Sequence, residues 1–166
     1  MSSNFVVLMI NPFSSFRLPR KRTSAHALFL NHKDEILIVK PTYLNHWLTP
    51  GGLVEHDESP IEACIREVKE ELGLDMPGIK QLLGVEYNPN LGRGGDGLAF
   101  VFYGGRLSET DIEKIVLQES ELCDFKFVPS HDLSLLNTKL QKRVARCMEG
   151  AQRSAVVYLE AGVMIG

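Results

Sequence analysis

The stretch GLVEHDESPIEACIREVKEELGL, residues 52–74, carries the strongest structural signal in the sequence. Ser59 is a good helix N-cap, and the proline that follows it suits the first helical position. Glu62 completes an S-x-x-E capping box with that serine. Gly73 can end the helix, because glycine readily adopts the left-handed conformation of a C-terminal cap. The stretch therefore predicts an α-helix over residues 60–72.

The predicted helix has one apolar face and one acidic face when its residues are placed at about 100° intervals. The apolar face consists of Ile61, Cys64, Ile65, Val68 and Leu72. An adjacent arc holds three acids, Glu67, Glu70 and Glu71. Ala63 shares that arc, and its small size would leave room for a substrate. Arg66 stands one turn before Glu70 and can pair with it. Glu67 and Glu71 are expected to face each other without a cation on the helix.

This arrangement of acids is unfavourable for an isolated helix. Like charges one turn apart repel, and acids in the C-terminal half oppose the helix dipole. Such breaks of local rules gather at functional sites. A hard divalent cation would relieve the repulsion, and Mg²⁺ commonly binds carboxylates together with water and substrate phosphates. The alternative is an ordinary solvated acidic face.

Composition limits the classes of protein that the chain can belong to. Its 166 residues fit one domain with a sizeable core, and its formal net charge of −3 argues against a general nucleic-acid binder. The three cysteines lie far apart without a CxxC pair, which predicts neither a disulfide framework nor a zinc site. The apolar residues 5–10 are too few to span a membrane. We expect a soluble, cytoplasmic protein.

Strands and helices are expected to follow one another along the rest of the chain. Predicted strands cover residues 24–31, 35–41, 79–89, 97–107, 122–129 and, near the end, 155–162, the first two forming a hairpin. Predicted helices cover 108–117 and 137–150, the latter with Leu140, Val144 and Cys147 on its apolar side. Pro50-Gly51-Gly52 predicts a turn or loop between short extended pieces. These elements indicate a mixed sheet flanked by helices.

Residues 52–74 resemble the signature of the Nudix hydrolase (MutT-like) family. That signature is G, five residues, E, seven residues, REU, one residue, EE, one residue and GU, where U is bulky and apolar. Every defined position is filled, by Gly52, Glu58, Arg66, Glu67, Val68, Glu70, Glu71, Gly73 and Leu74. The seven fixed identities would coincide by chance about once in 10⁸ starts at average residue usage.

The resemblance implies an α/β fold, a Nudix-type α/β/α sandwich with a central mixed β-sheet and a catalytic loop-helix-loop. It divides the chain into an N-terminal extension (1–20), a Nudix hydrolase domain (21–150) and a C-terminal tail (151–166) that could pack on the domain.

The resemblance also implies Mg²⁺- or Mn²⁺-dependent hydrolysis of a pyrophosphate linkage in a nucleoside diphosphate derivative by metal-activated water. Glu67, Glu70 and Glu71 would hold the metal, together with the backbone carbonyl of Gly51. Arg66 would orient Glu70. Two further residues of the signature, Glu58 and Gly52, would shape the loop-helix-loop, with Glu58 as a conceivable outer ligand.

Many members of the family take a further carboxylate from a distant loop. Glu121, at the start of ELCDFKFVP, is the candidate here, and Glu119 is the second choice. A general base for the attacking water would then be Glu70 or Glu121. An exposed loop acid without a catalytic role is the alternative for both loop residues.

The substrate is not assigned by these residues. ADP-ribose-like nucleotide sugars and (d)NTP-type nucleotides are both expected candidates, and no substrate-binding residue is identified. Two other classes stay open: a non-catalytic module that senses or binds nucleotides on the same fold, and an isomerase on the same scaffold. The expected partner is a small molecule rather than a membrane, and one possible assembly is a homodimer.

Overall fold

The computed structural model describes residues 20–75, 79, 81–89 and 95–165. Almost all of the predicted N-terminal extension therefore lies outside the described residues. The elements are β1 (Arg22–Leu30), β2 (Ile36–Pro41), β3 (Gly51–Leu53), α1 (Pro60–Leu72), β4 (Gln81–Asn88), β5 (Gly97–Arg106), α2 (Glu109–Glu113), β6 (Leu122–Val128), α3 (Thr138–Gln152), β7 (Val157–Glu160) and β8 (Val163–Met164). No helix in the described part of the chain is long and apolar enough to cross a membrane.

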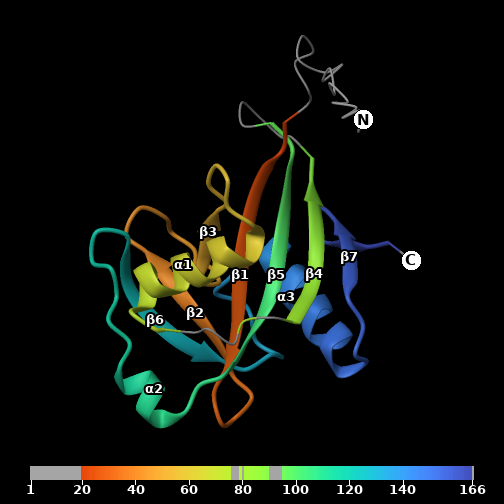
Figure 1. Ribbon diagram of the computed structural model, residues 1–166. Helices are drawn as coiled ribbons and strands as arrows, with labels where there is room; N and C mark the ends of the chain where they lie inside the picture. Colours follow the sequence, from red (N-terminus) through yellow and green to blue (C-terminus); the bar gives the residue numbers. More distant parts are fainter. Residues whose placement is uncertain (1–19, 76–78, 80, 90–94, 166) are drawn as a thin grey trace, which may run out of the picture.

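The strands form one mixed sheet in the order β6-β2-β1-β5-β4-β7-β8, and β3 pairs with β1 beside this path. The pairs β1–β5 and β4–β7 are parallel, whereas the other pairs are antiparallel. Helix α1 lies against one face of the sheet and α3 against the other (Figure 1). The expected α/β sandwich around a mixed sheet is confirmed.

Strand β1 separates two apolar cores, because successive side chains of a strand point to opposite faces. Ala25, Ala27 and Phe29 pack with α1, whereas Leu28 and Leu30 pack with α3. On α3 the buried residues include the three predicted ones, Leu140, Val144 and Cys147. The central strand thus supports both helical layers.

The ends of α1 follow the local signals of the sequence. The Ser59 side chain accepts a hydrogen bond from the Glu62 backbone, and the Glu62 side chain accepts one from the Ser59 backbone. Gly73 has φ 69° and donates its N–H to the Lys69 carbonyl. The predicted helix over residues 60–72 is confirmed at both ends.

The expectation at Pro50-Gly51-Gly52 was partly wrong. The chain bends at Pro50, but Gly51–Leu53 is strand β3, whose residues pair with Ser24, Ala25 and His26 of β1. Inter-strand hydrogen bonds to β1 outweigh the turn preference of two glycines. Strand β8 was not predicted, because its two residues are too short to form a pattern.

Two glycines let α3 approach the sheet closely. A Cβ at Gly84 would lie 2.7 Å from a methyl carbon of Val157 and 2.9 Å from the Cys147 sulfur. A Cβ at Gly150 would lie 2.7 Å from the other methyl carbon of Val157. Val157 of β7 is therefore held between β4 and α3.

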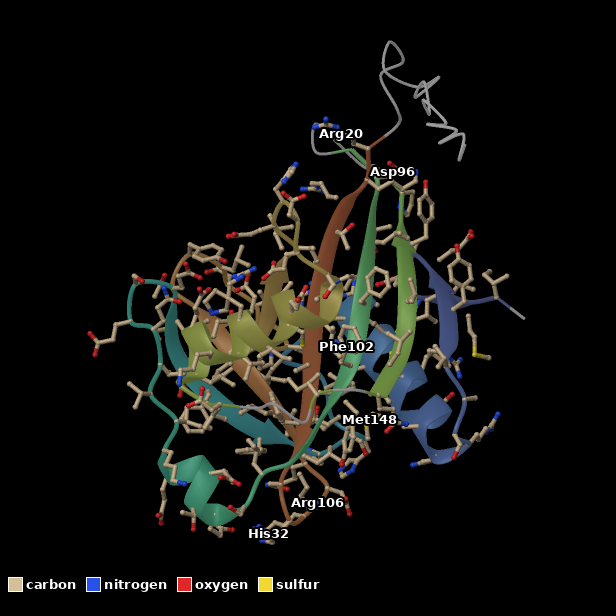
Figure 2. The ribbon with its side chains drawn as sticks, viewed as in Figure 1. Arg20, His32, Asp96, Phe102, Arg106 and Met148 are labelled. Carbon is tan, nitrogen blue, oxygen red and sulfur yellow. The ribbon has the colours of Figure 1, made fainter. Side chains whose placement is uncertain are left out.

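Ion pairs tie the two ends of the central strands to their neighbours. Figure 2 shows Arg20 and Asp96 at one end of the sheet and His32 and Arg106 at the other. Asp96 binds Lys21 and accepts a hydrogen bond of 2.9 Å from the Tyr87 hydroxyl. At the opposite end, Arg106 binds Asp34. These contacts hold the ends of the parallel pair β1–β5, whose residues pack against α1.

Candidate metal centre

The three acids of α1 differ in their exposure to solvent. Glu71 is buried, with 7% of the residue exposed, whereas the side chain of Glu67 is 15% exposed and that of Glu70 is 49% exposed. The cluster therefore runs from the interior to the surface within one turn of the helix.

The prediction that Ala63 leaves room for a substrate was wrong. Ala63 is fully buried and packs in the apolar core beneath α1. Helix α1 contacts both β1 and β3, so its buried face is wider than its apolar arc. That face includes Ala63 and Glu71, whereas Ile61 and Ile65 are only half buried. The small side chain of Ala63 lets α1 pack closely against the sheet, and it does not leave room for a ligand.

Arg66 is the centre of the hydrogen bonds among the acids. Its Nε and Nη2 donate to the two oxygens of Glu58 at 2.9 and 3.0 Å. Its Nη1 donates to Glu67 at 2.9 Å and to Glu70 at 3.0 Å. The Glu58 carboxylate is the main reason that the pKa of Arg66 lies above its ordinary value.

The pairing of Arg66 with Glu70 was predicted, but the pairing with Glu67 was not. The expectation that Glu67 has no cation on the helix was wrong, because the guanidinium carries several donors and one of them reaches two carboxylates. Glu58, predicted to shape the loop, is joined to Arg66 and also accepts from the Glu55 N–H at 3.0 Å.

The two glycines of β3, Gly51 and Gly52, lie in direct contact with the carboxylates of Glu71 and Glu67. Gly51 has φ 129°, and a Cβ there would overlap the backbone of Ala25. Its N–H donates to Glu71 Oε2 at 2.7 Å. A Cβ at Gly52 would overlap the carboxylate of Glu67. Larger residues would therefore displace the acids or the strand.

Glu121 lies on a loop that is fastened to the C-terminal end of α1. The Val116 N–H donates to the Leu72 carbonyl at 3.0 Å, and the Gln118 N–H donates to the Glu71 carbonyl at 3.2 Å. These bonds satisfy carbonyls that the end of a helix leaves unpaired. The Glu121 charge acts on the pKa of both Glu67 and Glu71. Glu121 therefore lies close enough for its charge to act on the cluster. Glu119 is exposed, and it is not among the described residues whose charges act on the pKa of Glu67 or Glu71.

Burial and the charges of neighbouring acids raise the pKa of Glu67 and Glu71. The pKa of Glu71 is raised to about 8, mainly by burial and also by the charges of Glu67, Glu121 and Glu70, while the Gly51 N–H acts against this rise. Burial also raises the pKa of Glu67, although Arg66 counteracts it. Without a cation, this cluster keeps a proton on Glu71 at neutral pH.

Carboxylate oxygens of this kind fit a hard divalent cation. The charges of Glu70 and Glu121, which are exposed, raise the pKa of the more buried Glu67 and Glu71, and this mutual repulsion is what a divalent ion would relieve. Across residues 20–75, 79, 81–89 and 95–165, no three Asp, Glu, His or Cys side chains converge at metal-ligand spacing. In this arrangement Arg66 donates hydrogen bonds to Glu67 and Glu70, and the Gly51 N–H donates one to Glu71.

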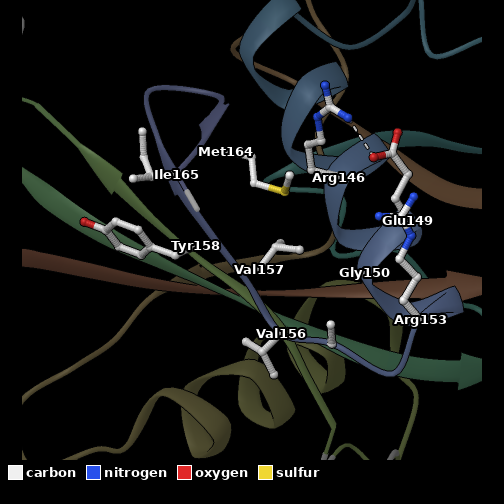
Figure 3. A pocket seen from close by; sticks show the side chains of 10 residues that line it. Arg146, Glu149, Gly150, Arg153, Val156, Val157, Tyr158, Met164 and Ile165 are labelled. Carbon is white, nitrogen blue, oxygen red and sulfur yellow. Dashed lines mark hydrogen bonds and ion pairs between the residues drawn. The ribbon is translucent and has the colours of Figure 1, made fainter.

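A separate pocket of about 250 Å³ lies between the C-terminal part of α3 and strands β7 and β8 (Figure 3). The ion pair Arg146–Glu149, at 2.7 Å, lies on its α3 side, and Tyr158 and Met164 line it from the strands. It lies beside α3, away from α1, so it is not part of the acidic cluster.

The fold and the cluster together define an α/β sandwich protein with carboxylates crowded along one helix. The sequence model of the NUDIX domain matches residues 20–149, so this chain belongs to the NUDIX family.

Three known proteins illustrate the range of its relatives. An ADP-ribose pyrophosphatase of Methanocaldococcus jannaschii is 37% identical over 124 residues, which cover 70% of this chain and 69% of that protein. The mRNA-decapping enzyme subunit 2 of Saccharomyces cerevisiae is 44% identical over 50 residues, or 30% of this chain, and the match spans only 5% of the yeast protein. The crystal structure of a MutT protein from Methanosarcina mazei Go1 has a TM-score of 0.68 at 24% identity, covering 81% of this chain and 99% of that one.

Proposed function

We propose that this protein is a Mg²⁺- or Mn²⁺-dependent hydrolase that cleaves the pyrophosphate linkage of a nucleoside diphosphate derivative with water. The observation that carries the proposal is the crowding of Glu67, Glu70 and Glu71 on one turn of α1, where Arg66 binds Glu67 and Glu70 and the charge of Glu121 acts on Glu67 and Glu71. A protein gains nothing in stability from a buried carboxyl whose pKa is raised in this way. The cluster is better explained by a cation that it binds.

Glu67, Glu70 and Glu71 would hold the cation, together with the Gly51 carbonyl. When bound, the metal supplies charge neutralisation at the phosphoryl oxygens and a more acidic water molecule. Gly52 keeps space for the Glu67 carboxylate. Gly51 fixes Glu71 through its N–H. The chain would thus contribute oriented oxygen ligands in a site that extends from the buried Glu71 to the half-exposed Glu70.

The proton of the attacking water would pass to Glu70 or to Glu121. Glu70 is half exposed and is held by Arg66 through a single hydrogen bond of 3.0 Å, so Arg66 would act as the residue that positions it. Glu121 is an exposed residue of the loop before β6, and its charge raises the pKa of Glu67 and Glu71. Either carboxylate would act as a general base at the cluster, and the products would be two phosphate-bearing molecules.

Two substrate classes are proposed as candidates: ADP-ribose-like nucleotide sugars and (d)NTP-type nucleotides. The relative from M. jannaschii is an ADP-ribose pyrophosphatase, which supports the first. The protein would act on small molecules in the cytoplasm, and a homodimer is one possible assembly.

The test is turnover of nucleotide sugars, dinucleotides and nucleoside triphosphates with Mg²⁺ or Mn²⁺, compared with the same reactions in chelator. We expect metal-dependent cleavage, and Glu70→Gln should reduce turnover by orders of magnitude in a folded protein. Glu121→Gln against Glu119→Gln separates the two loop acids, because only the first is expected to reduce turnover. Wild-type turnover in Glu70→Gln would contradict the site.

Two other functions would give different results in the same assay. Tight metal-dependent binding without cleavage would indicate a nucleotide-sensing module. Rearrangement of a substrate without phosphate-bearing cleavage products would indicate an isomerase. Either result would replace the hydrolase proposal.

A further inference from the structure

Strand β6 lies at one margin of the sheet, and its outer edge is not paired with another strand. The strand order ends at β6, whose only partner strand in the described part of the chain is β2 (Figure 1). The strand at the opposite margin, β8, has only two residues, whereas β6 has seven. An edge strand presents N–H and C=O groups that can pair with a further strand. The outer edge of β6 is therefore a place where a partner can bind.

The contacts of β2 show which backbone groups of β6 point outward. Val39 of β2 lies opposite Phe125 of β6. Both the N–H and the carbonyl of Val39 are bonded to Leu48, at 2.9 Å each, so neither is left for Phe125. The N–H and the carbonyl of Phe125 therefore point away from β2, toward the free edge. In agreement with this, the Phe125 N–H donates to the side chain of Asp124 at 2.8 Å.

The two residues that flank Phe125 carry opposite charges. Asp124 and Lys126 are exposed, and they lie on the same face of the strand because they are two residues apart. Lys126 Nζ lies 5.0 Å from the centre of the Trp47 ring, which packs on the α3 side of the sheet. Phe125 is half buried and packs on the α1 side. Within the described ranges, neither Asp124 nor Lys126 forms an ion pair.

A second copy of β6 supplies the complementary charges in one register. In a two-fold antiparallel pair, residue i faces residue j and j faces i, and facing side chains lie on the same side of the sheet. If Phe125 faces its own copy, Asp124 of each chain faces Lys126 of the other. If Asp124 or Lys126 faces its own copy instead, like charges are opposed, which is destabilising. The charges therefore select the register centred on Phe125.

The same register uses the outward backbone groups. Phe125 of each chain would donate its N–H to the Phe125 carbonyl of the other, as directly opposed residues do in a hydrogen-bonded pair. This bond would replace the contact with Asp124 and release that carboxylate to face Lys126. The two Phe125 rings would lie opposite each other on the α1 side, which is a favourable cross-strand pair. Charges on an edge strand commonly exclude wrong partners, and here they would exclude every register except one.

We propose that this protein forms a two-fold symmetric dimer in which the β6 strands of two chains pair antiparallel about Phe125. The two sheets then form one continuous sheet, joined by Asp124–Lys126 pairs on the α3 side and by the Phe125 rings on the α1 side. The contact goes beyond the proposed hydrolysis and requires neither nucleotide nor metal.

Sedimentation equilibrium at pH 7 and physiological ionic strength, over a range of protein concentrations, tests the assembly. We expect a reversible equilibrium between one chain and a species of twice its mass. Asp124→Lys and Lys126→Asp each place like charges opposite one another in both pairs, so each should raise the Kd of the dimer about tenfold or more. Glu113→Lys and Lys114→Asp make the same charge changes at exposed positions near the end of α2 and should alter the Kd less than about threefold.

Mixing the two charge-reversal variants tests the register. Asp124→Lys has two bases beside Phe125 and Lys126→Asp has two acids, so a mixed dimer again has opposite charges in both pairs. Both substitutions in one chain restore the same complementarity. We expect a Kd within about threefold of the wild type in both cases. A Kd that is unchanged by the single reversals, or that neither combination restores, overturns the proposal.

Urea unfolding of each variant establishes that it is folded. Where a charge reversal does not fold, Asp124→Asn and Lys126→Gln provide the comparison, because removing one charge of each pair should also weaken the dimer, whereas Glu113→Gln should not. A dimer that is insensitive to these neutral variants as well overturns the proposal.

Amide hydrogen exchange locates the contact in the wild type. Exchange of the Phe125 N–H should slow as the protein concentration rises through the Kd, whereas the Gln141 N–H, which binds the Asn137 carbonyl within α3, should exchange at a constant rate. A dimer without slower exchange at Phe125 overturns the proposal. A monomer at every concentration also overturns it, and slow exchange at Phe125 in that monomer would identify another segment of the same chain as the cover of the edge.

The dimer and the hydrolase fail separately, because the assembly is measured without nucleotide or metal. A monomer that cleaves a nucleotide would refute the dimer and retain the hydrolase. A dimer with the predicted charge dependence but without turnover would refute the hydrolase and retain the dimer.

Discussion

Replacing Glu71 by glutamine should stabilise the metal-free protein at neutral pH. The buried Glu71 carboxyl has a pKa of about 8, against an ordinary value of 4.5. In that interval the folded chain keeps a proton that the unfolded chain releases, so this group makes the folded state less stable as the pH rises from 4.5 toward 8. Glutamine is neutral throughout and can still accept the Gly51 N–H.

The size of the effect follows from the two pKa values. At pH 7 the raised pKa costs about 3 kcal/mol of folding free energy, and at pH 5 it costs less than about 1 kcal/mol. Glu71→Gln should therefore exceed the wild type by about 2–3 kcal/mol at pH 7 and nearly equal it at pH 5. Added Mg²⁺ should stabilise the wild type more than the variant, since a bound cation favours the ionised carboxylates.

Urea unfolding in chelator at pH 5, 6, 7 and 8 measures this difference directly. Glu113→Gln, an exposed acid on α2, is the matched control and should follow the wild type at every pH. Parallel curves of stability against pH for the wild type and Glu71→Gln would refute the reasoning, as would a variant less stable than the wild type at pH 7.

Three further predictions concern glycines, the buried ion pair and the cysteines. Gly52→Ala should reduce metal-dependent turnover about tenfold or more by displacing Glu67, and should change the free energy of unfolding in urea by less than about 1 kcal/mol. Gly51→Ala should lower the free energy of unfolding by several kcal/mol, because its Cβ would overlap the backbone of Ala25. Equal losses of stability in the two variants would contradict this contrast. Arg143→Met should cost about 3–5 kcal/mol because it leaves the Glu86 charge buried without a partner, and a loss below about 1 kcal/mol would show that the pair contributes little. Burial raises the pKa of the Cys64 and Cys147 thiols to about 12. Iodoacetamide at pH 8 should therefore label the native protein once, at the exposed Cys123. Two or three labels in the mass spectrum would contradict the burial of the other two cysteines.

Features that depend on neighbouring residues could be predicted from the sequence. The bounds of α1 follow from Ser59, Glu62 and Gly73, and the principal strands and α3 follow from local patterns of apolar residues. The pairing of Arg66 with Glu70 is likewise a property of one helical turn. The spacing of the signature acids was sufficient to identify the family.

Features that depend on contacts between distant residues could not be predicted. Helix α1 buries Ala63 because β1 and β3 meet it on two sides, and no helical wheel contains that information. Glu86 and Arg143 are 57 residues apart, and neither lies in a recognisable motif. Strand β3 was missed because Gly51 favours a turn in isolation, and the strand forms only by pairing with β1.

The position of Val157 between Gly84 and Gly150 has a consequence for how the α3 layer of this scaffold can be changed by mutation. Val157 lies within contact range of both glycines, so α3 is held at a fixed height above β4, and Arg143 is held with it. A side chain added at either glycine would meet Val157, so the helix would have to move away from the strand to admit it. A larger residue at Gly84 or Gly150 would therefore have to be combined with a smaller one at Val157, which makes these three positions one unit for redesign.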